Sequence, residues 1–523
     1  MSVSSNSERR SLVESTSYQD VIERFKWSDL WDLFGGNAES LNIANECLDR
    51  HREAGAAVNL RKSDGTYEVL TFTDLSMWTS RFAHYLDEIG VQGGEAVAVM
   101  LEPSLGFYTA LFGAIKHGAA AVPLFPLFGP DAIRMRLNDC RAKVLVVGAE
   151  RSDLAGLIDG INVIVLNDSL LGGLARFPSE YQASTRADDI AVLQYTSGTS
   201  RQLPEAVRHS HRAIVTVMIA ALFGVGLKPA DKYFCPSSPA WGHGLWHGTI
   251  APWALGIGTG AYAGRFAPIS LVDCLRHFEI DNLAAAGTVY RMMLRDGVLQ
   301  YAPRLKKASY TGESLDAKTL AILHDELATP VCGMYGTTET GVIVANFPGF
   351  EDYEGRLGAL GKPVPGWEVA VLDAQENPVE SGTTGEICVR RRGSWFRSKD
   401  LARWDEDGYL WYLGRADDII ISAGWTISPI EVENALVQHQ DVIEAAVVGV
   451  PDPVRGQVLK AFVVSRGLAP NLESELKDLV RTKLSPHEYP RYVEFVTELP
   501  KTTSGKVNRR ELRARYSPSE LEP

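Results

Sequence analysis

Strands of buried type alternate with helices in the first part of the chain, and this alternation limits the fold more than any other feature. Strand-like apolar runs occur at Ala96–Met100, Gly118–Leu124, Lys143–Val147, Val163–Leu166 and Ile190–Leu193, with a helical segment at Gly106–His117 between the first two. Strands connected by helices of about 10–15 residues pack into parallel sheets. We therefore predict an α/β fold with a large N-terminal body of mainly parallel sheets.

The pattern changes after the loop at Pro363–Gly366. A strand-rich section, Glu368–Arg391, predicts a β-rich subdomain. Beyond Asp418 the pattern alternates between the two types, with helices at 430–437 and 472–484 and strands at 445–449, 458–465 and 492–495. This predicts a small α+β C-terminal domain. We place the boundary near Asp417, between a large domain of residues 1–416 and a small domain of residues 417–523.

Local signals predict further elements. Tyr18–Phe25 has helical spacing, and a helix opens at Thr71–Leu75 with Thr73 as its expected N-cap. The uncharged stretch Ala213–Leu227 is short for a membrane span, so we interpret it as a buried helix. We interpret Gly244–Gly264 as core strand and turn, because His247, Pro252 and several glycines interrupt it. We expect no membrane span and see no signal peptide.

Length and composition exclude several classes of protein. A chain of 523 residues is too long for one ordinary core and predicts several subdomains. The formal net charge of −13 argues against nucleic acid as the main partner. The six cysteines are scattered and form no C-x-x-C pair, so we expect neither a zinc site nor a disulfide framework, and a reducing, cytoplasmic location.

The stretch from Lys399 to Leu436 gathers polar residues where the large body meets the small domain. We expect Asp400 in a turn, a second turn at Asp405–Gly408, short strands at Tyr409–Leu413 and Ile419–Ile421, and a helix N-cap at Ser428. A hinge beside a ligand and a solvated surface hairpin both fit this pattern.

Three segments carry residues suited to phosphate chemistry. In Gln194–Ser200, small hydroxyl residues and a glycine follow a strand and can surround phosphate oxygens, or form an ordinary turn. In Gly333–Gly341, Tyr335 can stack on a base and Glu339 can hold Mg²⁺, or be a solvated acid. In Lys501–Arg510, a lysine on a glycine loop can neutralise developing charge, or belong to a solvated basic tail.

Together these segments resemble one family, the AMP-forming acyl-CoA synthetases of the adenylate-forming superfamily, over about residues 50 to 515. The resemblance rests on YTSGTS (195–200), TGES (311–314), MYGTTETG (334–341), KDLARWDEDGYLWYLGRADD (399–418) and PKTTSGKVNR (500–509). It implies a ligase that joins a carboxylic acid to ATP as an acyl-adenylate, releasing pyrophosphate, and then transfers the acyl group to coenzyme A. Mg²⁺ is the implied cofactor, and a homodimer the implied assembly.

The resemblance also implies roles for individual residues. The phosphate loop would be Thr196, Ser197, Gly198, Thr199 and Ser200. The adenine site would comprise Gly312, Glu313, Ser314 and the stacking Tyr335, followed by Gly336, Thr337 and Thr338, with Thr338 on the α-phosphate and Glu339 on Mg²⁺. Asp400 and Arg415 would hold the ribose, Lys506 would assist adenylation, Asp417 would be the hinge of a mobile small domain, and Gly424 and Trp425 would meet coenzyme A.

The identity of the acid stays open. The expected carboxylate pocket contains Trp241, His243, Gly287, Gly333 and Met334. Its small residues leave room for a ring or chain, and His243 either binds a polar ring substituent or only lines the entrance. The chain is similar to benzoate-type and medium-chain acyl-CoA synthetases. We expect an aromatic acid (benzoate, an aminobenzoate such as anthranilate, or a hydroxybenzoate), with a medium-chain fatty acid as the alternative.

One segment departs from the family pattern. The phosphate loop continues Arg201-Gln202-Leu203-Pro204-Glu205-Ala206, with Glu205 where a lysine is usual. Because an acid repels a triphosphate, we expect Glu205 to point away while Arg201 or Arg208 substitutes. Three rival functions share parts of this pattern: an adenylation enzyme that loads a free carrier protein, a nucleotide-binding protein without activity, and a luciferase-like oxidase.

Overall fold

The computed structural model describes residues 12–154, 160–195, 206–312, 315–337, 339–422, 425–452, 455–467, 469–484, 488–502 and 506–515. Several residues assigned above lie outside the described residues, namely Thr196, Ser197, Gly198, Thr199, Ser200, Arg201, Glu205, Glu313, Ser314, Thr338 and Gly424. The structure therefore places the other members of the predicted site.

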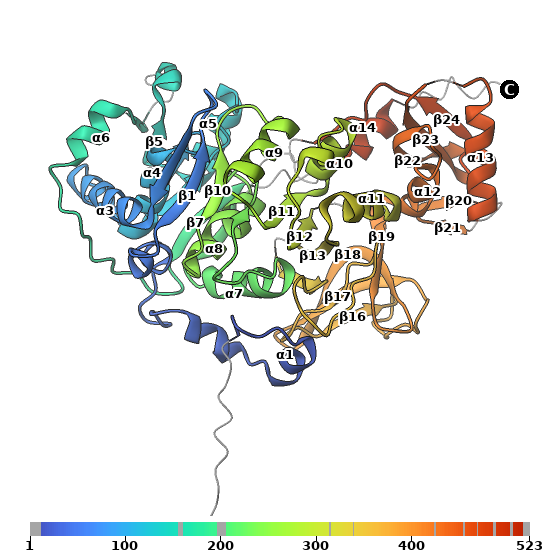
Figure 1. The fold of residues 1–523 in the computed structure, drawn as a ribbon, viewed down its shortest axis with the longest axis horizontal. Helices are drawn as coiled ribbons and strands as arrows, with labels where there is room; N and C mark the ends of the chain where they lie inside the picture. The colour runs from blue at the N-terminus through green and yellow to red at the C-terminus, as the bar shows by residue number, and fades with distance from the viewer. Residues whose placement is uncertain are drawn as a thin grey trace, which may run out of the picture.

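A six-stranded sheet forms one part of the N-terminal body (Figure 1), in the order β6-β5-β3-β4-β7-β8. All neighbours run parallel except β7 and β8. Its strands are β3 (Ala96–Met100), β4 (Ala120–Pro123), β5 (Val144–Val147), β6 (Asn162–Val165), β7 (Ile190–Tyr195) and β8 (Ala206–Ser210). Helices cover both faces, so these strands are mostly apolar runs. The predicted parallel α/β body is confirmed.

A nine-stranded sheet forms the second part, in the order β15-β14-β13-β12-β11-β9-β10-β1-β2. From β13 to β1 the neighbours are parallel, and antiparallel strands complete both edges. The strands are β1 (Ala56–Arg61), β2 (Tyr67–Thr71), β9 (Tyr233–Phe234), β10 (Thr259–Tyr262), β11 (Asn282–Ala286), β12 (Lys307–Thr311), β13 (Val331–Thr337), β14 (Gly341–Ala345) and β15 (Lys362–Pro363). The carboxyl ends of β9, β11, β12 and β13 therefore meet at one edge, where ligands of such sheets bind.

Helices pack on and between these sheets. They are α1 (Tyr18–Arg24), η1 (Trp27–Leu33), α2 (Ile43–Cys47), η2 (Asp49–His51), α3 (Phe72–Glu88), α4 (Leu105–His117), α5 (Pro130–Cys140), η3 (Ala149–Leu154), α6 (Asp168–Leu174), α7 (Ala213–Ile219), η4 (Ala220–Gly224), η5 (His243–Ile250), α8 (Ala251–Ala254), α9 (Pro268–His277), α10 (Gly287–Arg295), η6 (Leu299–Tyr301) and α11 (Ala317–Leu327). Within the part of the chain that the structure describes, none of the helices has the length and apolarity needed to span a bilayer.

Two local predictions in the body are wrong. Thr71, not Thr73, caps α3, because its Oγ1 accepts from Asp74 N at 3.0 Å, whereas Thr73 Oγ1 donates to Arg52 O at 2.7 Å. The segment from residue 244 to 264 is helical at first, as η5 and α8, and becomes a strand only at β10. Glycine is required at Gly244, since a Cβ there would lie 2.3 Å from the Ser237 carbonyl oxygen.

The C-terminal part contains two smaller sheets (Figure 1, orange to red). A four-stranded antiparallel sheet comprises β16 (Val369–Leu372), β17 (Gly385–Arg391), β18 (Ser394–Trp404) and β19 (Leu410–Arg415). After η7 (Ala416–Asp418), the small α+β domain contains β20 (Ile420–Ser422), β21 (Trp425–Ile427), α12 (Pro429–Leu436), β22 (Val442–Asp452), β23 (Gly456–Ser465), α13 (Leu472–Lys483), β24 (Tyr492–Phe495) and α14 (Arg509–Ala514). The predicted N-cap is confirmed, because Ser428 Oγ accepts from Glu431 N.

Asp400 does not lie in a turn, as the sequence suggested. It lies within β18 and pairs with Arg415 of β19. The preceding Lys399 has a φ of 62°, so the backbone kinks immediately before Asp400 without ending the strand. The Asp and Gly chemistry used to predict turns therefore misplaces Asp400, although it correctly places the turn between β18 and β19.

Candidate active site

Asp400 is the centre of a buried polar cluster between β13, β18 and β19. Asp400 is only 6% exposed to solvent. Tyr335 of β13 donates its hydroxyl to Asp400 Oδ2 at 2.6 Å, and Tyr412 of β19 donates to Oδ1 at 3.1 Å. Arg415 Nη1 lies 3.6 Å from Oδ1. Tyr335 and Arg415, both predicted to bind adenosine together with Asp400, thus lie against its carboxylate, and Tyr412 is a partner that the sequence did not indicate.

The electrostatic environment of Asp400 combines burial with neighbouring donors. Burial raises the pKa of the Asp400 carboxyl, while the hydroxyls of Tyr335 and Tyr412 and the charges of Arg415 and Lys506 act in the opposite direction. Lys506 belongs to the small domain, and its charge has the smallest of these effects on the pKa of Asp400. The carboxylate in turn raises the pKa of Tyr335, which is already raised by burial.

The segment Tyr335–Gly341 continues from the carboxyl end of β13 into a tight turn. Tyr335, Gly336 and Thr337 lie within β13 rather than in a loop after it. A Cβ on Gly336 would lie 2.0 Å from the Gly341 carbonyl oxygen, so only glycine fits there. Glu339 is exposed at the turn, and Arg391 Nη1 donates to its backbone oxygen at 2.8 Å. The carboxylate of Glu339 is therefore presented at the edge where β13 ends.

Gly312 occupies the corresponding position after β12. Its φ is +92°, in the left-handed region that favours glycine, and the space where a Cβ would lie is open. Because β12 and β13 are parallel neighbours, Gly312 and Tyr335 lie at the same edge of the sheet. This arrangement leaves room for a flat ring beside Tyr335.

The small domain contacts the body at both ends of α12. Near its start, Arg403 of β18 pairs with Glu431 at 3.1 Å, and Ser428 Oγ donates to the Leu413 oxygen. Beyond its end, Lys318 of α11 donates to the Val437 oxygen at 2.9 Å. These contacts join the small domain to the body through α12. Asp417, the predicted hinge, lies in η7 with its Oδ2 3.9 Å from Arg415 Nη2.

Lys506 is carried by a hairpin of the small domain. Lys501 and Val507 form a β-bridge, and Thr502 N donates to the Lys506 oxygen at 2.7 Å. Directly after this hairpin, Arg509 forms two hydrogen bonds of 2.7 Å with the buried carboxylate of Glu433 on α12. The pair anchors the base of the hairpin to α12, while the Lys506 residue is exposed.

The residues predicted to line the carboxylate pocket fall into two groups. Gly333 lies within β13, on the same face as Tyr335, and Gly287 follows the end of β11 at the start of α10. His243 lies on η5, close to Cys235 after β9. In contrast, Met334 faces the other side of β13 and packs against Gly224 of η4.

Trp241 packs against aromatic residues next to the six-stranded sheet. Its ring lies 5.8 Å from that of Phe125 and 6.3 Å from that of Phe128, centroid to centroid. Both phenylalanines follow β4 in the six-stranded sheet. Trp241 therefore packs where the two halves of the body meet. Within the described part of the chain, no hydrogen bond or ring contact joins Trp241 to Tyr335.

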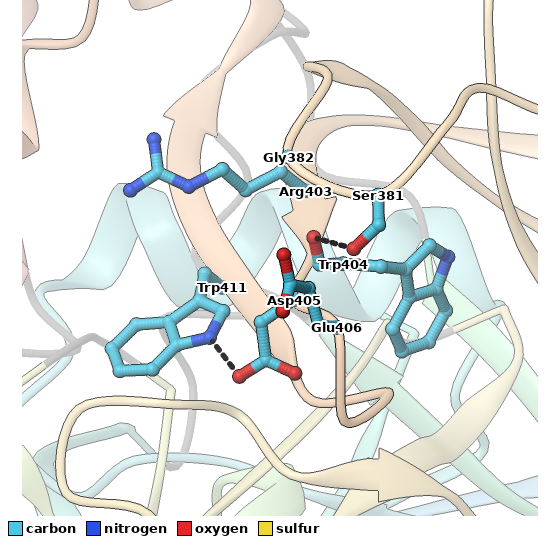
Figure 2. Close-up of a pocket in the computed structure, with 7 residues that line it drawn as sticks. All are labelled: Ser381, Gly382, Arg403, Trp404, Asp405, Glu406 and Trp411. Carbon is cyan, nitrogen blue, oxygen red and sulfur yellow. Dashed lines mark hydrogen bonds between the residues drawn. The ribbon is translucent and has the colours of Figure 1, made fainter.

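A hollow on the β-rich subdomain lies away from the predicted site (Figure 2). It is lined by Ser381, Gly382, Arg403, Trp404, Asp405, Glu406 and Trp411. Asp405 already accepts from Trp411 Nε1 at 2.9 Å and from Arg356 at 2.6 Å, and Ser381 donates to the Trp404 oxygen. Because these polar groups are paired with each other, the hollow is not a candidate for the nucleotide site.

Comparisons with known proteins agree with this geometry. Residues 45–396 match the model of the AMP-binding enzyme family, and residues 431–506 match its C-terminal domain. An acetyl-coenzyme A synthetase of Bacillus subtilis (strain 168) is 31% identical, over 95% of each chain.

Two solved structures are similar over nearly their whole length. One is an anthranilate CoA ligase in complex with anthranoyl-AMP, at 26% identity and a TM-score of 0.83, covering 95% of this chain and 100% of that chain. The other is a benzoate CoA ligase from Burkholderia xenovorans LB400, at 27% identity and a TM-score of 0.79, covering 91% and 100%.

Proposed function

Since the chain belongs to the AMP-binding enzyme family and is an AMP-forming acyl-CoA synthetase, a ligase that uses ATP and coenzyme A, we propose that it activates an aromatic carboxylic acid at the edge of β11, β12 and β13. The observation that carries the proposal is the Asp400 cluster, in which an aromatic ring, a carboxylate and a guanidinium converge.

The cluster suits the adenosine part of ATP. A carboxylate is a strong acceptor for the two hydroxyls of a ribose, and a neighbouring guanidinium limits the cost of burying it. We assign Asp400 and Arg415 to the ribose and the ring of Tyr335 to the adenine face. Lys506 approaches the reacting carboxylate and α-phosphate, where a positive charge stabilises the charge that develops during adenylation.

Magnesium fits the exposed carboxylate of Glu339. Mg²⁺ in nucleotide sites is held by one or two carboxylates together with phosphate oxygens, rather than by a cage of protein ligands. Among the described residues there is no group of three His, Cys, Asp or Glu side chains that would form such a cage. When bound, the ion would neutralise phosphate charge, while Glu339 holds its position at the turn after β13.

The second half-reaction requires a different position of the small domain. We propose that rotation about Asp417 withdraws Lys506 and brings Gly424 and Trp425 to the channel for coenzyme A. The contacts on α12 made by Lys318 and Arg403 are polar and partly exposed, so they can break at low cost.

An aromatic substrate is supported by the small residues at the strand ends and by the two ligases named above, which act on anthranilate and benzoate. The residues at the end of β11 and at the start of α10 are small (Ala284–Ala286 and Gly287), which suits a pocket for a flat ring, whereas Gly333 lies against the ring of Tyr310. The acetyl-coenzyme A synthetase relative identifies the small aliphatic acids as the competing class.

The test is acid-dependent release of pyrophosphate and AMP with a panel of benzoates and of straight-chain acids from acetate to octanoate. We expect the highest kcat/KM with a benzoate. Lys506→Ala should slow pyrophosphate release by orders of magnitude, yet leave transfer to coenzyme A from a supplied acyl-adenylate nearly intact. A preference for a straight-chain acid would refute the aromatic assignment. Equal loss in both half-reactions would refute the role of Lys506.

A further inference from the structure

The π-helix η5 carries two histidines on one face. His243 and His247 are four residues apart, and their ring centroids lie 5.5 Å from each other with an interplanar angle of 49°. π-helical turns are rare and frequently occur at functional sites. The sequence indicated His243 as a pocket residue but not His247, because His247 lies in the segment Gly244–Gly264, which was expected to form strand and turn.

The surroundings of η5 fix both rings in place. His243 Nδ1 lies 2.9 Å from Ser237 Oγ, and Tyr233 donates its hydroxyl to the backbone oxygen of His247 at 2.9 Å. A Cβ on Gly248 would lie 3.0 Å from Cys235 Cβ, so the helix lies directly against the end of β9. The two rings are therefore positioned by packing and not free to turn toward solvent.

One nitrogen of each ring lacks a partner. His243 Nε2 and His247 Nδ1 are buried, and neither forms a hydrogen bond with the described residues. Burial lowers the pKa of His243 to about 3 and that of His247 to about 4, so both rings are neutral at pH 7. A neutral imidazole offers one donor and one acceptor. Buried polar atoms without partners are uncommon in native proteins and call for a ligand or ordered water.

His243 lies beside the expected acyl pocket. Phe234 of β9 pairs with Leu283 of β11, which places Cys235, and the His243 ring beside it, next to Ala284. Along the same edge, β11 ends in alanines and Gly287 follows. Small apolar residues and the His243 imidazole thus lie together where the strands end, and the His247 ring follows 5.5 Å from that of His243.

We propose that the acid carries an uncharged hydrogen-bonding substituent, such as a hydroxyl or amino group, and that His243 and His247 bind it. This rests on the proposed function and narrows its substrate class. A plain hydrocarbon group would leave both nitrogens unpaired in the complex, whereas a hydroxyl or amino group both donates and accepts. Neutral rings provide no charge to balance a second carboxylate, so dicarboxylic acids are disfavoured.

The experiment compares acids that differ only in this substituent. Benzoate is measured against its 2-, 3- and 4-hydroxy and amino derivatives, and hexanoate against 6-hydroxyhexanoate, by acid-dependent pyrophosphate release with the full-length protein. We expect at least one substituted acid to exceed its parent by about tenfold or more in kcat/KM, since a site built for a hydrogen bond discriminates strongly against its absence.

Variants then locate the effect. His243→Phe and His247→Phe should each reduce this preference several-fold, with thermal unfolding as a check of the fold. His209→Phe is the matched control. His209 lies on β8 of the six-stranded sheet, and burial lowers its pKa to about 4. Its ring packs against that of Trp246, with the two centroids 4.8 Å apart. His209→Phe should leave the preference unchanged.

Two results would overturn the inference. One is that the parent protein activates every unsubstituted acid with the same kcat/KM as its substituted derivative. This result would be decisive without any variant. The other is a preference that survives in both His243→Phe and His247→Phe. Failure of all acids to release pyrophosphate would instead refute the proposed function, so the two failures are distinguishable.

Discussion

Replacing Asp400 with asparagine tests the nucleotide site most directly. The substitution keeps the shape of the side chain and removes its charge. Each oxygen of Asp400 accepts from one tyrosine, at 2.6 and 3.1 Å. A tyrosine hydroxyl can turn to accept from the new amide, so the protein itself should lose little. A ribose hydroxyl that donated to the carboxylate loses a charged acceptor, and such hydrogen bonds contribute about 1.5–3 kcal/mol.

This range sets the size of the expected effect. Because every 1.4 kcal/mol is a factor of ten, Asp400→Asn should weaken ATP binding by about 10- to 150-fold. The dissociation constant is measured by calorimetry near pH 8, where the carboxylate is ionised. Asp405→Asn is the matched control. Asp405 lies between β18 and β19 and its carboxylate also accepts a hydrogen bond, from Trp411, but it lines the hollow of Figure 2 and not the Asp400 cluster.

A chemical cycle with 2′-deoxy-ATP separates direct from indirect effects. If Asp400 binds the ribose, 2′-deoxy-ATP should bind the parent protein less tightly than ATP does. Asp400→Asn should then reduce the affinity for 2′-deoxy-ATP by a smaller factor than the affinity for ATP. Equal losses for ATP and 2′-deoxy-ATP would refute the assignment to the ribose. So would an Asp400→Asn protein that binds ATP as tightly as the parent.

Three further predictions follow from contacts around the site. Because burial raises the pKa of Asp400 and Arg415 lowers it, nucleotide binding should weaken as pH falls through a pKa above the usual Asp range, and Arg415→Gln should move this acid limb to higher pH; an unmoved limb contradicts the coupling. Lys318→Ala, which frees the end of α12, should slow adenylation about 2- to 5-fold, consistent with one exposed contact, without slowing coenzyme A transfer from a supplied acyl-adenylate; equal slowing contradicts it. Arg509→Met, which leaves the Glu433 carboxylate unpaired, should lower the free energy of unfolding by about 3 kcal/mol in urea, and an unchanged midpoint contradicts the anchoring role.

The sequence predicts the layered body well because its signals are local. Buried strands such as Ala96–Met100 and their connecting helices are marked by apolar runs, and a short segment is enough to recognise them. The errors arise where one residue decides the outcome. Thr71 and Thr73 are equivalent by composition, yet only Thr71 Oγ1 reaches the amide of Asp74 at the third helical position.

For the site as well, local motifs identify single residues, but contacts between distant segments could not be predicted. Motifs identify Tyr335, Asp400 and Arg415 individually, but the hydrogen bond between Tyr335 and Asp400 joins strands 65 residues apart, and no spacing rule gives that distance. Tyr412 was not predicted because it is one of two adjacent aromatic residues on β19, and only the register of β18 and β19 turns its hydroxyl toward Asp400.

His247 illustrates a different limit. Glycine, proline and histidine within residues 244–264 argue against a regular helix, yet the chain forms the π-helix η5 followed by α8, in which Pro252 lies in the first turn. Gly244 lets η5 approach the backbone of Ser237 and Ser238. Any helical turn brings His243 and His247, four residues apart, to one face, whereas the strand expected over this segment does not pair them. The sequence already allowed His243 to bind a polar ring substituent, but the structure was needed to place His247 beside it.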